Sequence, residues 1–227
     1  IILDANQGGY DPFNNLIHRK HFNRQLGYLL VYRMNCIMEV HPTHLVATLL
    51  LQYRNGITKH QLIQKVHWLH LQIQQRHGQV IGMELNNKFE IIDNAIGHLG
   101  NLVIQRSDNV YEPNIASREA YKHMLGLGLY RNKIGHLFYL EGLFATALYA
   151  IIQFKENTKK VVLKSQLLYQ VSFLHALLYR EFIIHAHIDQ QIDMTLILDQ
   201  MIDNRIFIHD VDNDTISVDS EYGEKTY

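Results

Sequence analysis

The spacing of apolar side chains predicts helices over most of the chain. Within residues 14–38, leucine, phenylalanine and methionine recur at helical spacing, with arginine and lysine between them. Pro42 suits the first turn of a second helix, and Thr58 suits the N-cap of a third. The predicted helices run over residues 14–38, from Pro42 to the Asn55-Gly56 stop, from Thr58 to His77-Gly78, and from Asn87 to Leu99.

Two short β-hairpins are predicted, one in each half of the chain, and each follows a helix. Asn101 and Asn204 occupy matching places before the first strand of each hairpin, which suggests two winged-helix-like units. The predicted strands are 102–106 and 110–112 around the turn 107–109, and 204–208 and 215–218 around the turn 212–214, after a helix over 196–202. We therefore predict a mainly α fold, a helical bundle with two short β-hairpins. The predicted domains are residues 1–120, a helical unit ending in a hairpin, and residues 121–227, a second such unit with an acidic tail.

Two long apolar stretches separate the hairpins, at residues 134–154 and 163–184. The first is 21 residues long, near the length that spans a bilayer, but His136 and Glu141 interrupt it. The second contains charged residues and is amphipathic. We expect both stretches to pack in a helical core rather than to cross a membrane.

Composition and charge limit the class of protein. The chain has 227 residues, 47% of them hydrophobic, with 3 prolines and 13 glycines, which is typical of a folded protein. Its one cysteine, Cys36, excludes an intramolecular disulfide and favours a reducing compartment. The net charge is −1, but the last 30 residues hold 8 acidic and 2 basic residues, so the remainder is mildly basic. Because both hairpin turns contain aspartate, no nucleic-acid partner is expected.

Histidine is the residue type most suggestive of chemistry, with 15 in the chain. Three pairs stand at i, i+3, a spacing that puts two imidazoles on one helix face, as in part of a zinc site. These pairs are His18 with His21, His41 with His44, and His67 with His70. Ordinary packed or exposed histidine is the alternative, and no HExxH motif is present, so no metal site is predicted. The sequence also lacks P-loop, GxGxxG and GxSxG motifs, and we assign no catalytic residue.

One stretch of the chain resembles a known enzyme family. Residues Tyr130 to Glu141 read YRNKIGHLFYLE and continue through 145–150. They resemble the carboxy-terminal region of glycerol-3-phosphate acyltransferases, where a tyrosine, an asparagine, a histidine and a glutamate recur at this spacing. Glu141 favours the mitochondrial-type enzymes, because peroxisomal relatives tend to have proline there. Further blocks resemble the same region in the same order, so that the resemblance covers roughly residues 22–218: 42–47, 93–101 and 181–202.

The resemblance implies transfer of a fatty acyl group from acyl-CoA to the 1-hydroxyl of glycerol 3-phosphate, the first step of glycerolipid synthesis. In that family a histidine of an HxxxxD motif is the general base, and an FxEGxR block supplies an arginine for the phosphate. The HxxxxD match in this chain, His209 with Asp214, lies at the opposite end from the family's order, and the arginine is missing after 139–142. The catalytic half is thus absent. We expect either a fragment that begins after the acyltransferase domain, which Ile1 as the first residue favours, or a degenerate paralogue. In both cases we expect the chain to be inactive alone.

Candidates for binding or interdomain contact lie in the same stretch. They are Arg131, Asn132, His136 and Glu141, with structural roles as the alternative. The implied partners are the chain's own upstream acyltransferase domain, a membrane surface, and acyl-CoA and glycerol 3-phosphate through the full enzyme, with no cofactor besides the acyl-CoA substrate. The implied location is the mitochondrial outer membrane, facing the cytosol. The alternative function is a winged-helix-like protein-interaction module without catalytic activity.

Overall fold

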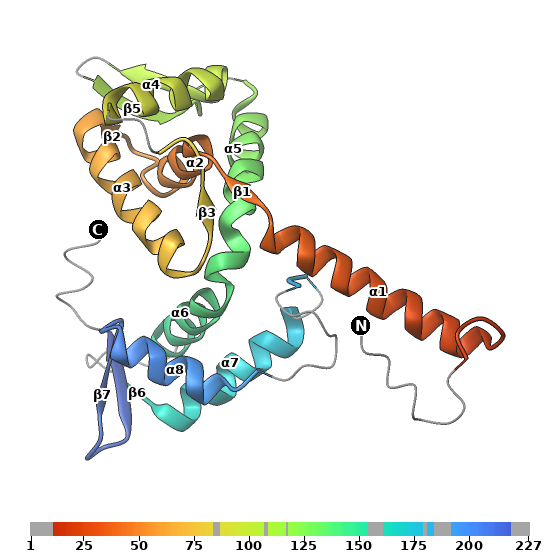
Figure 1. Cartoon of the computed structure of the whole chain (residues 1–227). Coiled ribbons are helices and arrows are strands. Elements are labelled where there is room, and N and C mark those ends of the chain that lie inside the picture. Colours follow the sequence, from red (N-terminus) through yellow and green to blue (C-terminus); the bar gives the residue numbers. More distant parts are fainter. Residues whose placement is uncertain are drawn as a thin grey trace. The chain divides into compact units, whose positions relative to one another are not determined.

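A computed structural model describes most of the chain (Figure 1). The described residues are 11–83, 87–106, 109–116, 118–153, 161–178, 181–183 and 192–218. They divide into two compact units. The first unit is Arg33–Leu137, and the second is Phe138–Tyr227, with which residues Ile1–Tyr32 are grouped.

The first unit packs helices around a small antiparallel sheet. Its main elements in chain order are α2 (Pro42–Gln52), β2 (Ile57–Thr58), α3 (Lys59–Gln75), α4 (Lys88–Leu99), β4 (Val103–Arg106), β5 (Val110–Pro113) and α5 (Ala120–Gly135). Strand β5 lies between β2 and β4, with Tyr111 opposite Ile57 in β2. Smaller elements are β1 (Glu39–Val40), its parallel partner β3 (Gln79–Val80), and the 3-10 turn η1 (Gly100–Leu102).

The second unit contains the same kinds of elements. In chain order they are α6 (Tyr139–Gln153), β6 (Val161–Leu163), α7 (Lys164–Leu178), α8 (Met194–Asp203), β7 (Phe207–Asp210) and β8 (Thr215–Val218). Strand β8 lies between β6 and β7, with Ile216 opposite Val162 in β6. The 3-10 turn η3 (His136–Phe138) precedes α6.

Both units therefore follow one topology. The order is helix, strand, helix, helix, strand, strand, and the last strand pairs with both earlier strands. This is the arrangement of a winged-helix domain, in which a hairpin follows a helix-turn-helix pair. The mainly α fold with two short hairpins is confirmed, and each hairpin is the wing of its unit.

Side-chain caps begin the helices where the sequence predicts. The Thr58 hydroxyl accepts a hydrogen bond from the Gln61 N–H, and the Gln61 side chain accepts one from the Thr58 N–H. The side chains of Asn87 and Asp193 accept backbone N–H groups at the starts of α4 and α8. The predicted starts at Thr58 and Asn87 are confirmed.

The two units repeat each other at the level of single residues. Lys59 begins α3 and bonds to Asp93 in α4, while Lys164 begins α7 and bonds to Asp199 in α8. Each aspartate lies six residues after the N-cap of its helix. Core side chains three and seven residues after each lysine also correspond: Leu62 and Val66 in α3, and Leu167 and Val171 in α7. The repeat rests on these positions and not on the two predicted asparagines, because Asn101 lies three residues before Ile104 whereas Asn204 lies four residues before the equivalent Ile208.

Two details of the predicted strands need correction. Strand β7 begins at Phe207 rather than at residue 204, because Arg205 adopts a φ of 58° that extended backbone cannot accommodate. Strands β2 and β6 were not predicted, because their two and three residues are too short to show an alternating pattern.

The apolar stretch 134–154 is largely explained by the core of the second unit. One apolar face of helix α6 packs in that core. Its buried residues are Tyr139, Leu143, Phe144, Ala147, Leu148 and Ile151. The helix predicted over 14–38 is confirmed as α1 (Leu16–Cys36), which contains no buried residue. Because α5 packs against α2, the first compact unit extends to Leu137. The division into domains 1–120 and 121–227 stays a prediction.

Candidate functional site

Two blocks that carry the family resemblance meet in the first unit. The first block begins α2, and the second forms the end of α5. The ring centroid of His44 lies 5.8 Å from that of Tyr130 and 5.7 Å from that of His41. With Lys133, these residues form a cluster that we call the α2–α5 corner.

The histidine pair His41 and His44 caps the N-terminus of α2. The His41 N–H donates a hydrogen bond of 2.9 Å to Nδ1 of His44, and Pro42 occupies the first turn, where a missing N–H costs nothing. Because Nδ1 accepts, the neutral ring of His44 carries its proton on Nε2. The pair that the sequence marked as half of a zinc site thus serves as a helix cap.

The electrostatic setting keeps His44 neutral. Burial lowers the pKa of His44, and the nearby His41 and Lys133 lower it further. A neutral imidazole can donate one hydrogen bond from Nε2 but contributes no charge for binding an anion. The corner therefore fixes the packing of α2 on α5, and the cations that could bind an anion lie on the exposed part of α5.

The predicted residues Arg131 and Asn132 lie together on α5. Both are exposed, and an Arg131 guanidinium nitrogen lies 3.4 Å from Oδ1 of Asn132. His136 is half-buried in η3, and burial lowers the pKa of His136 against the effect of a hydrogen bond with the Lys133 backbone. Arg131 and Asn132 are thus accessible to a partner, whereas His136 has a partly structural setting.

The fourth predicted residue, Glu141, belongs to the second unit. It lies half-buried in the first turn of α6, two residues after Tyr139. Burial raises the pKa of Tyr139, whose hydroxyl lies 3.2 Å from Nδ1 of His175 and whose ring stacks on Phe182 at 4.6 Å. The resembling stretch thus contributes to both units, and its aromatic and histidine contacts within the second unit are structural.

The HxxxxD match forms a contact within the wing of the second unit. Nε2 of His209 lies 3.1 Å from Oδ1 of Asp214, across the turn between β7 and β8. Asp214 is exposed and has a φ of 48°, as expected for a residue that closes a turn. Among the described residues, no group of three or more His, Cys, Asp or Glu side chains could hold a metal ion.

An ion pair to a buried carboxylate in the first wing was missed by the sequence analysis. Nε of Arg106 donates to Oε1 of Glu112 at 3.0 Å, and a second guanidinium nitrogen lies 2.8 Å from Oε2. The Glu112 side chain is buried whereas that of Arg106 is 61% exposed, so the guanidinium reaches the carboxylate from the surface of the unit. The feature that could have revealed this ion pair is the hairpin register, which places both residues on one pair of strands.

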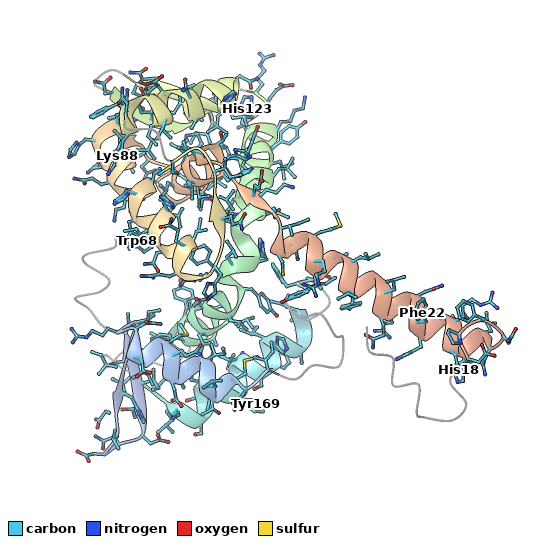
Figure 2. The ribbon with its side chains drawn as sticks, viewed as in Figure 1. His18, Phe22, Trp68, Lys88, His123 and Tyr169 are labelled. Carbon is cyan, nitrogen blue, oxygen red and sulfur yellow. The ribbon has the colours of Figure 1, made fainter. Side chains whose placement is uncertain are left out.

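A second buried polar residue is His123 on α5 (Figure 2), which bonds through Nδ1 with the Asn114 carbonyl at 2.8 Å.

Within the described residues, one helical stretch is long and apolar enough to cross a membrane. It runs from Ala120 to Ile152, and 39% of its most apolar window is buried inside the structure. Length and composition alone support a membrane role only weakly, because core helices also pass this test. The buried face of α6 supplies part of this apolar character.

Comparison with known proteins gives the family. A family model described as the glycerol-3-phosphate acyltransferase C-terminal region matches residues 4–225, which is almost the whole chain. A search of curated proteins returned no match. The matched range includes both winged-helix units and the stretch from Tyr130 to Glu141. The chain therefore belongs to the glycerol-3-phosphate acyltransferase family, of which it carries the C-terminal region.

Proposed function

We propose that this chain supports the catalytic domain of an enzyme that acylates the 1-hydroxyl of glycerol 3-phosphate. In that reaction the hydroxyl oxygen attacks the thioester carbonyl of acyl-CoA, the new C–O bond forms, and the C–S bond breaks to release CoA. The hydroxyl proton goes to a histidine of the catalytic domain. The family match over residues 4–225 is the observation that carries the proposal.

The part assigned to this chain is structural. The His209–Asp214 pair lies on a wing whose turn is exposed, and Asp214 holds the strand connection rather than a substrate. The exposed polar groups of α5, including Arg131 and Asn132, are available for a neighbouring domain or its anionic substrates. We therefore propose an inactive scaffold that contacts its upstream acyltransferase domain and uses no cofactor of its own.

Membrane association and location follow from the same proposal. The acyl-CoA substrate is amphipathic, and the apolar stretch Ala120–Ile152 is consistent with a protein that works at a lipid surface. We propose that the full enzyme acts at the mitochondrial outer membrane, with this region facing the cytosol.

A protein-interaction module without a link to catalysis is the second candidate. The duplicated winged-helix topology favours it, because such units present helices and wings to partners. Nucleic acid is a poor partner for the second unit, where α8 contains Asp199 and Asp203 and no cation. The wing adds Asp210, Asp212 and Asp214.

Co-purification with a catalytic domain of the family separates the two candidates. We expect this chain to retain such a domain on an affinity column, and Arg131→Ala with Asn132→Ala to weaken retention. Lys88→Ala, an exposed change on α4, is the matched control and should bind as the unchanged chain does. A chain that folds but retains no catalytic domain would favour the interaction module.

A further inference from the structure

The outer side of α5 is apolar and exposed, although its inner side is buried. Tyr121, Leu125 and Leu129 recur every four residues, and they are 63%, 66% and 70% exposed. Residues four apart share one face of a helix, so the three side chains form a continuous stripe. The inner side packs within the first unit through His123, Leu127 and Ile134. An exposed apolar stripe of this kind marks a surface that meets a partner.

Two lysines lie along one edge of this stripe. At about 100° per residue, Lys122 and Lys133 fall beside the stripe, whereas Arg131 stands four residues after the buried Leu127 and falls on the flank of the inner side, and all three are exposed. The Lys122 ammonium bonds to Glu119 at the helix start and lies 6.0 Å from the ring centroid of Tyr121. The helix itself contains no acidic residue. This edge therefore favours a negatively charged partner.

We propose that the outer face of α5 docks on a membrane that contains anionic phospholipids. The face consists of Tyr121, Leu125, Leu129, Lys122 and Lys133. The apolar side chains enter the interfacial region of the bilayer, and the long lysine side chains beside them reach the headgroup phosphates. The proposal rests on the membrane association proposed above and is independent of acyl transfer.

Charge complementarity is what selects a lipid surface over a second protein. Helix α7 of the second unit carries a stripe with the same spacing, in which Tyr169, Phe173 and Leu177 are 74%, 56% and 65% exposed. The cation of α7, Lys164, is bonded to Asp199, as Lys122 of α5 is to Glu119, so the charge that distinguishes the α5 stripe is that of Lys133. The two stripes have similar apolar content and differ in bordering charge. The α7 stripe is therefore the natural control.

Vesicle binding of the full 227-residue chain tests the proposal. We expect the chain to co-sediment with vesicles of phosphatidylcholine and phosphatidylglycerol, and much less with phosphatidylcholine alone. Leu125→Gln with Leu129→Gln should lower the partition coefficient about tenfold or more, because two exposed leucines no longer enter the bilayer. Phe173→Gln with Leu177→Gln, the matched pair in α7, should leave vesicle binding unchanged.

The cations provide an independent measurement. Lys133→Gln should weaken binding to anionic vesicles about fivefold, Arg131→Gln on the other flank of α5 should weaken it less, and added salt should remove these differences. All substituted side chains are exposed, and circular dichroism melting confirms that each variant folds.

Three results would overturn the proposal. The α5 variants could bind anionic vesicles as tightly as the unchanged chain, which would reject the face but keep membrane association. The unchanged chain could ignore anionic vesicles, which would reject both and leave acyl transfer untouched. The α5 variants could alter only the oligomeric state in light scattering, which would assign the face to a second copy of the chain.

Discussion

The two winged-helix units share a topology but present different surfaces. The first unit has 11 basic and 7 acidic residues over Arg33–Leu137, whereas Phe138–Tyr227 has 7 basic and 13 acidic residues. Both keep the lysine at the start of their second helix and the aspartate that it meets. The two units therefore share this ion pair and an apolar core, whereas their surface charge differs.

Corresponding positions in the two wings show the same contrast. Glu112 lies opposite Ile104, and Ser217 lies opposite Ile208, so these two residues correspond. Arg106 bonds to Glu112, but the equivalent positions in the second wing are Asp210 and Ser217, which cannot form an ion pair. One topology thus tolerates the presence or the absence of an ion pair at this place.

The largest expected effect comes from the matched core leucines. Leu62→Ala and Leu167→Ala should each lower the free energy of unfolding by about 2–5 kcal/mol, because both side chains are fully buried and leave a cavity. Chemical denaturation measures the loss, and Leu71→Ala, an exposed change on α3, is the control. If the Leu62 and Leu167 changes shift different transitions, the two units unfold separately. Equal loss in one shared transition would show that they fold together.

Removing the buried carboxylate should have the next largest effect. Glu112→Gln should cost about 1–3 kcal/mol, because the buried amide pairs less well with the Arg106 guanidinium. Ser217→Ala, the corresponding change in the second wing, should cost little. Equal losses from both substitutions in thermal melts would contradict the contrast between the wings.

Acidic pH should destabilise the first unit, because it contains partly buried histidines. The pKa values of His44, His70 and His136 are lowered, in each case mainly by burial. A lowered folded-state pKa stabilises the fold above the unfolded value near 6.5, and this stability is lost as pH falls through the folded-state pKa. Protonation of Nδ1 in His44 would also remove its hydrogen bond from the His41 N–H.

Unfolding midpoints measured from pH 7.5 to pH 4.5 test this expectation. His44→Gln should flatten the decline on acidification, because it removes one group that takes up a proton on unfolding. His60→Gln, an exposed change on α3, is the control and should leave the slope unchanged. A slope that His44→Gln leaves intact would assign the acid sensitivity elsewhere.

The smallest effect is expected at the repeated ion pairs. Double-mutant cycles on Lys59 with Asp93, and on Lys164 with Asp199, should each give a coupling energy of about 0.2–1 kcal/mol, because both aspartates are half exposed. Similar values in the two units would support a shared role, and a coupling in only one would break the correspondence.

Much of the fold could be predicted from the sequence because its signals are local. The caps at Thr58 and Asn87 and both hairpins follow from residue type and spacing over a few positions. Strands β2 and β6 could not be predicted, because they exist only through pairing with residues far along the chain. The start of β7 could not be predicted for the same reason. Arg205 adopts a left-handed backbone directly after the C-cap of α8, and this conformation delays the strand.

The candidate site was harder to predict for the same reason. The resemblance identified Arg131, Asn132, His136 and Glu141, but sequence spacing cannot show that they fall in two compact units. His44 contacts Tyr130, although most of the first unit lies between the two residues in the sequence. The exposed stripe on α5 was also hidden, because its leucines resemble core residues until their exposure is known.

Acyl transfer with and without a catalytic domain tests the central claim most directly. Radiolabelled glycerol 3-phosphate and palmitoyl-CoA are incubated with this chain, with a catalytic domain of the family, and with both together. The scaffold account predicts no product from the chain alone, and more product from the mixture than from the catalytic domain by itself. Lysophosphatidate formed by the chain alone, and lost in His209→Ala, would contradict the account by placing a general base within this region.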